Sequence, residues 1–184
     1  MRECILRKAN EMKQLNDISM KGEIVMFGST YMAGFPLYEL ANRCMLEHAI
    51  YNRSIEGLTV EEALTIAEDC IVDIKPSKLF LSLGEEDAKS PDVLEAYTRL
   101  VSMLQKQLPD CRLFLIGLTG TDAYAKRLNA HLQTLCEEKK MQYIAFVSRE
   151  QSEMALYRAR FKQLSCCFRD RALTVPEAFA MAEI

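Results

Sequence analysis

The sequence predicts an α/β fold built around a mainly parallel sheet. Five short apolar runs recur along the 184 residues, and the segments between them carry the spacing and the end signals of helices. Each intervening helix is about 12 to 18 residues long, which is enough for a right-handed crossover between parallel strands. No repeat, low-complexity tract or linker interrupts the alternation, so we expect residues 1–184 to form a single domain.

The expected strands are short apolar runs bounded by turn residues. Ile24–Phe27 is a continuous apolar run, the pattern of a strand that is covered on both faces. Gly84 ends a similar run, and Gly120 belongs to the loop after another. The five expected strands span residues 23–28, 49–55, 78–83, 112–118 and 142–147.

The expected helices are marked by their ends. Pro36 suits a first helical turn, where its missing N–H costs nothing. Thr59 and Glu62 form a capping-box pattern that marks the start of one helix. Pro109 marks the end of another, which precedes it directly. The expected helices span residues 3–20, 36–48, 59–74, 90–108 and 122–140, the first of them within an N-terminal segment, 1–22. Beyond residue 148 a further helical pattern is apolar enough to pack on the sheet or on a partner chain.

Composition limits the classes of function. Hydrophobic residues make up 49% of the chain and charged residues 27%, as in ordinary soluble proteins. The net charge of −3 gives no electrostatic case for nucleic acid, and no apolar run approaches the roughly 20 residues that span a bilayer. The seven cysteines form no C-x-x-C pair and the N-terminus has no signal-peptide core, so we expect a cytoplasmic protein with reduced thiols and no cofactor.

Two hydroxyl side chains follow the first expected strand. Gly28 allows a sharp turn there, and Ser29 and Thr30 come directly after it. Ligands bind outside the carboxyl ends of strands in open parallel sheets, so this position favours a functional role. Short hydroxyl side chains also cap helices, and a purely capping role for both residues stays open.

Four sequence blocks lie at the expected strand ends and before the last helix. They are Ile24–Gly34, Asn52–Gly57, Leu81–Asp87 and Leu173–Phe179. In order and spacing these blocks resemble those of the SGNH (GDSL-type) hydrolases, over residues 23 to 184. The resemblance implies a three-layer α/β/α sandwich with a flavodoxin-like, five-stranded parallel sheet. It also implies a small-molecule ligand or ester substrate, and it leaves the oligomeric state open.

The resemblance carries the family's site residues onto positions where most identities differ. Thr30 falls where the family has its nucleophilic serine and Ser29 where it has aspartate, although a shift by one residue makes Ser29 the nucleophile. Gly57 matches the glycine whose N–H belongs to the oxyanion hole. Glu86 falls where the family has an asparagine that donates to the same oxyanion.

The family's acid and base positions are also changed. Arg169 and Ala172 fall where the family has Asp and His, with Asp170 one position out of register. The chain has two histidines, His48 before the second strand and His131 within a helix, and neither is expected near the hydroxyls. A hydroxyl is a weak nucleophile until a neighbouring base takes its proton, so the expected site lacks its usual activation.

Three functions follow from this pattern. The first is a catalytically degenerate relative with a binding or regulatory role. The second is an esterase in which Thr30 or Ser29 attacks and a carboxylate such as Glu86 is the base. The third is a Mg²⁺ or Ca²⁺ site formed by the carboxylates of Glu56, Glu86 and Asp87 with the Ser29 hydroxyl. The clustered acidic residues at the strand ends are Glu56, Glu85, Glu86 and Asp87.

Overall fold

A five-stranded parallel sheet lies at the centre of the computed structural model, which describes residues 1–42, 44, 46–146, 150, 152–171 and 174–182. The strands are β1 (Ile24–Gly28), β2 (Ile50–Asn52), β3 (Lys78–Ser82), β4 (Arg112–Ile116) and β5 (Gln142–Ile144). Their order is β2-β1-β3-β4-β5, and every pairing is parallel. This is the order of a flavodoxin-like sheet, so the predicted fold class is confirmed.

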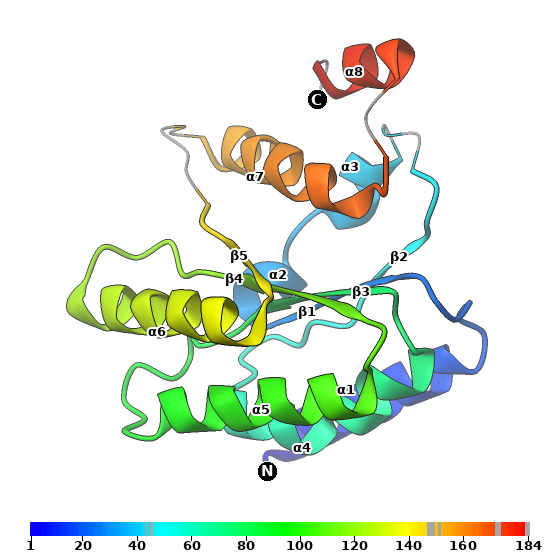
Figure 1. Cartoon of the computed structure of the whole chain (residues 1–184). Helices are drawn as coiled ribbons and strands as arrows, with labels where there is room; N and C mark the ends of the chain where they lie inside the picture. The colour runs from blue at the N-terminus through cyan, green and yellow to red at the C-terminus, as the bar shows by residue number, and fades with distance from the viewer. Residues whose placement is uncertain (43, 45, 147–149, 151, 172–173, 183–184) are drawn as a thin grey trace.

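Helices cover both faces of the sheet. They are α1 (Glu3–Asn16), α2 (Thr30–Ala33), α3 (Leu37–Ala41), α4 (Val60–Cys70), α5 (Val93–Gln107), α6 (Ala123–Lys139), α7 (Glu153–Phe168) and α8 (Val175–Ala182), with a 3₁₀ turn η1 (Val72–Ile74). In Figure 1, α1, α4, α5 and α6 lie below the sheet, whereas α3 and α7 lie above it with α8 beyond them. Within the described residues, no helix is both long and apolar enough to cross a lipid bilayer.

Alternate residues of the strands supply the two halves of the core. Val25 and Phe27 belong to the cluster with α1, α4, α5 and α6, whereas Ile24 and Met26 pack with α2, α3 and α7. On that second face Phe80 and Phe114 stack with their ring centroids 4.3 Å apart. Strands buried on both faces explain why their sequences are continuous apolar runs.

Two helix starts follow the capping chemistry of the sequence. Thr59 accepts a hydrogen bond from the Glu62 N–H, and the Glu62 carboxylate accepts one from the Thr59 N–H, which completes a capping box at α4. Asp122 accepts from the Ala125 N–H at 2.9 Å and caps α6. Each cap satisfies an N–H group that has no partner inside the helix.

The segment between β1 and β2 differs from the prediction of one helix over 36–48. Within the described part of that range the helix is α3, which starts after Pro36 and ends at Ala41, and the short helix α2 precedes it at Thr30–Ala33. Phe35, Leu37 and Leu40 are buried in the core, and tertiary packing of this kind overrides local helix propensity.

The regular strands at the sheet edges are also shorter than predicted. β2 ends at Asn52 rather than residue 55, because beyond it only the Arg53 and Ile55 N–H groups still bond to β1, at 2.8 and 3.0 Å. β5 ends at Ile144 instead of residue 147, and residue 147 lies outside the described part of the chain.

Candidate functional site

The segments after β1, β2 and β3 meet at the end of the sheet that holds the carboxyl ends of the strands. Gly28 permits this approach, because a Cβ atom at this residue would lie 2.5 Å from the Ser82 carbonyl oxygen of β3. The Ser29 N–H continues the ladder by donating to that oxygen at 3.0 Å, and the Ile55 N–H donates to the Gly28 carbonyl. The three loops are therefore held together by main-chain hydrogen bonds at the carboxyl ends of the strands.

Three of the predicted site residues contact one another at this end of the sheet. The Thr30 hydroxyl donates to Glu86 Oε1 at 2.5 Å, and it accepts from the Gly57 N–H at 2.9 Å. Gly57 has a φ of 73°, a left-handed conformation that favours glycine and aims its N–H toward Thr30. Thr30 begins α2, whereas Gly57 and Glu86 lie in the loops after β2 and β3, so the fold itself creates this arrangement.

Ser29 has a different environment from Thr30. Its side chain is fully buried, whereas Thr30 is exposed. Ser29 is the N-cap residue of α2, but its side chain makes no capping hydrogen bond. Thr30 is therefore the hydroxyl that faces solvent, and a side-chain capping role does not account for Ser29.

The carboxyl groups that flank Glu86 serve two different contacts. Glu85 Oε1 accepts from the Tyr31 N–H at 2.7 Å, and burial raises the pKa of this carboxyl. Asp87 is buried and accepts from the Val60 N–H at 3.2 Å, at the start of α4. Burial, with the nearby Glu86 charge, raises the pKa of Asp87 to about 6. Both residues anchor the loop, while Glu86 stays exposed beside Thr30.

The acidic residues do not assemble into a cation site. Glu56 is exposed on the loop after β2, and Asp87 is turned to the α4 N-terminus. Over the residues that the structure describes, no three His, Cys, Asp or Glu side chains are placed to hold a metal ion. The carboxylate cluster therefore gives no support to the Mg²⁺ or Ca²⁺ function.

Arg2 also belongs to this region, and no motif in the sequence indicates that it does. Its guanidinium donates to the Gly57 carbonyl oxygen and to Glu62 Oε2, each at 2.5 Å. The hydrogen bond to Glu62 raises the pKa of Arg2, and the nearby Glu86 charge adds a smaller contribution in the same direction. Only the packing of α1 against α4 brings this residue next to the Gly57 loop, and no local motif signals such a contact.

The two histidines lie away from Thr30. His131 on α6 is 3.0 Å from the Thr98 hydroxyl of α5. His48 lies between the carboxylates of Glu23 and Asp170, at 3.3 Å from each, near the amino end of β1. Both histidines are thus engaged in contacts that hold the fold together, as the sequence indicated.

The segment after α7 also lies at the amino ends of the strands. Asp170 pairs with Arg112 and, at 2.9 Å, with Lys78, and these two basic residues begin β4 and β3. Arg169 is buried and bonds to Glu177 at 2.9 Å. The structure therefore does not bring Arg169 to Thr30, and Ala172 lies outside the described residues.

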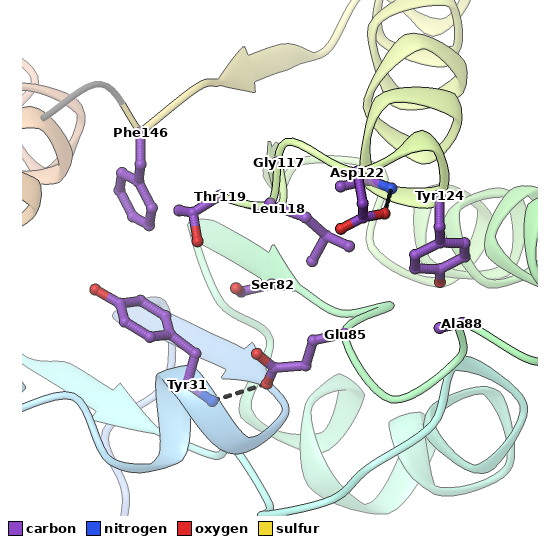
Figure 2. A pocket seen from close by; sticks show the side chains of 12 residues that line it. Tyr31, Ser82, Glu85, Ala88, Gly117, Leu118, Thr119, Asp122, Tyr124 and Phe146 are labelled. Carbon is purple, nitrogen blue, oxygen red and sulfur yellow. Dashed lines mark hydrogen bonds between the residues drawn. The ribbon is translucent and has the colours of Figure 1, made fainter.

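A cavity of about 310 Å³ opens beside the Thr30 turn, on the β4 and β5 side. Figure 2 shows the Glu85 carboxylate bonded to the Tyr31 N–H, with Phe146 above Tyr31 and the Leu118–Thr119 loop opposite. The lining residues are Tyr31, Ser82, Glu85, Ala88, Gly117, Leu118, Thr119, Gly120, Asp122, Tyr124, Ala125 and Phe146. The sequence marked Glu85 and the Thr119–Asp122 loop, but it gave no indication that aromatic side chains from distant segments would enclose a cavity.

Comparison with solved structures identifies the architecture. A GDSL-like lipase from Bacteroides thetaiotaomicron superposes with a TM-score of 0.71 at 10% identity, covering 87% of this chain and 96% of that one. The chain has an SGNH (GDSL-type) hydrolase-like fold. A Streptococcus pneumonia protein described as a platelet activating factor gives a TM-score of 0.79 at 16% identity, over 91% of this chain and 94% of that chain.

A third SGNH-like structure, an acetyl-xylooligosaccharide esterase mutant from Geobacillus Stearmophilus, gives a TM-score of 0.62 at 12% identity, with 84% of this chain and 98% of that chain covered. No protein-family model and no curated protein matches the sequence. Identities this low establish the fold alone, so the chemistry has to be argued from the residues of this chain.

Proposed function

We propose that this protein binds a small molecule through its SGNH-like fold and does not carry out acyl hydrolysis. The observation that carries the proposal is the exposed Glu86 carboxylate beside the Thr30 hydroxyl, 2.5 Å from it. A carboxylate stands where the resemblance expects a donor to the oxyanion. It engages the only exposed hydroxyl of the Ser29–Thr30 pair.

Charge at this position opposes acyl transfer. The tetrahedral intermediate of ester hydrolysis carries a negative oxygen, which is stabilised by fixed N–H donors, and the loss of one donor costs roughly 10²–10³ in rate. An ionised carboxylate only accepts hydrogen bonds, so Glu86 repels an oxyanion instead of stabilising it. The Gly57 N–H is already directed at the Thr30 hydroxyl, at 2.9 Å.

The site also lacks the usual base. A threonine hydroxyl needs a neighbouring group that takes its proton, and histidine is the common one because its pKa lies near neutrality. His48 is bound between Glu23 and Asp170 at the other end of the sheet, and His131 contacts Thr98. Neither histidine is free to serve the hydroxyl group of Thr30.

A second candidate is an esterase that uses Thr30 and Glu86 as a nucleophile and base. The same 2.5 Å contact favours it, since a base within hydrogen-bond reach of the nucleophile is the first requirement. The Gly57 N–H would then stabilise the oxygen of Thr30 as its proton leaves. Substrates of this reaction would be small esters.

Hydrolysis of short-chain nitrophenyl esters separates the two functions. The purified protein is compared with Thr30→Ala, Glu86→Gln and, as the matched hydroxyl control, Ser29→Ala. Glu86→Gln keeps an acceptor for the hydroxyl but removes the charge and the basicity. We expect every protein to hydrolyse the esters at the background rate. Turnover that disappears in Thr30→Ala and Glu86→Gln and persists in Ser29→Ala would refute the binding function and establish the esterase.

A further inference from the structure

The charges that line the cavity beside Thr30 have one sign. Glu85 and Asp122 contribute carboxylates, and no Lys, Arg or His is among the described residues that line it. Lys126 and Arg127 follow on α6, and they act on Asp122 and Tyr124 from outside the lining. The charged side chains of the lining itself are therefore acidic.

Glu85 is held so that it can face a ligand. Its Oε1 is fixed by the Tyr31 N–H at 2.7 Å, and Figure 2 shows its other oxygen turned toward the interior of the cavity. The residue is only partly exposed, and burial raises the pKa of its carboxyl. A partly buried carboxylate is costly to ionise, so a cation in the cavity would add to the stabilisation that the Tyr31 N–H and the Ser29 side chain give it.

Apart from the hydroxyl side chains of Ser82 and Thr119, the other side chains that line the cavity are aromatic or aliphatic. Tyr31, Tyr124 and Phe146 enclose the cavity together with Leu118, and ring faces attract cations as well as apolar groups. Arg160 of α7 already uses this attraction, since its guanidinium carbon lies 4.7 Å from the Tyr31 ring centroid and 5.4 Å from that of Phe146. Arg160 does not itself line the cavity.

We propose that this cavity binds a small organic cation, an amine or ammonium group attached to an apolar body, with Glu85 as its counter-ion. A volume of about 310 Å³ suits a ligand of this size. The aromatic side chains would pack against the apolar body while the carboxylate pairs with the charged group. This inference rests on the proposed binding function and names the class of ligand.

Calorimetry with three matched probes at neutral pH tests the proposal. Benzylamine is positively charged, benzyl alcohol is neutral and benzoate is negatively charged, and all three share one ring. We expect benzylamine to bind about tenfold or more tightly than benzyl alcohol, and benzoate not to bind. Glu85→Gln, which can still accept from the Tyr31 N–H, should remove the preference for the cation. Glu138→Gln, an exposed acid on the same helix as Tyr124, should leave it unchanged.

Any of three results would overturn the proposal: equal binding of the neutral probe, preferential binding of benzoate, or an unchanged cation preference in Glu85→Gln. Absence of benzylamine binding at millimolar concentration would overturn it as well. Ester hydrolysis that depends on Thr30 is a separate result, because it refutes the binding function and leaves the charge preference of the cavity to be read from these titrations.

Discussion

The raised pKa of Asp87 predicts that this residue makes the folded protein less stable as pH rises. Its carboxyl is 4% exposed and its pKa is raised from 3.8 to about 6, chiefly by burial. A folded-state pKa above the unfolded value means that the folded protein holds its proton longer, so this residue lowers stability as pH rises from about 4 to 6. At 1.36 kcal/mol per pKa unit, the carboxyl disfavours folding by about 3 kcal/mol once it is ionised.

Replacing Asp87 with Asn removes this cost while an amide oxygen remains to accept from the Val60 N–H. Urea unfolding of both proteins between about pH 4 and pH 8 should show the variant gaining about 2 kcal/mol relative to wild type across that range. Asp92→Asn, at an exposed position, serves as the control. Parallel pH profiles for wild type and Asp87→Asn would refute the reasoning, because the buried charge would then carry no penalty.

Two further changes test the packing around the site. Phe80→Ala removes a fully buried ring that stacks on Phe114. Thermal or urea unfolding should show that the free energy of unfolding falls by about 3–5 kcal/mol, and a fall below about 1 kcal/mol would contradict the packing described. Arg2→Gln breaks the ion pair with Glu62, whose pKa that arginine lowers to about 2, and because Arg2 is half exposed we expect a loss of at most about 1 kcal/mol near pH 7. The carboxylate is favoured when charged, so this loss should shrink as pH falls below about 4.5, and a loss that grew in acid would contradict it.

Local chemistry explains why much of the fold could be predicted. A strand buried on both faces has to be an apolar run, and a helix start has to satisfy its free N–H groups. The strand positions and the Thr59 cap could therefore be predicted from the sequence. The predicted helix over residues 36–48 starts correctly, since Pro36 precedes α3, but it ends too late, because α3 stops at Ala41 and no local signal marks that end.

The site was predictable only in part. The Gly28 turn and the three strand-end loops follow from topology, and the contact of Thr30 with Glu86 and Gly57 needed no more than the family's block order. The Arg2 contact depends on where α1 packs, and the cavity depends on Tyr31 and Phe146 meeting across the sheet edge. Such contacts join residues far apart in sequence and leave no periodic or local pattern.

Restoring the family's residues at the strand ends should not restore its chemistry. Thr30→Ser together with Glu86→Asn would supply the primary hydroxyl and an oxyanion donor next to the Gly57 N–H. The base would still be missing, because His48 and Asp170 are bound to each other at the amino ends of the strands. The length of β3 from Lys78 to Ser82 corresponds to roughly 13 Å of strand, beyond the reach of a hydrogen bond. We therefore expect the double variant to hydrolyse nitrophenyl acetate no faster than buffer. Turnover in this variant would mean that a base other than a histidine serves the site, and the missing histidine could then no longer explain why hydrolysis is absent.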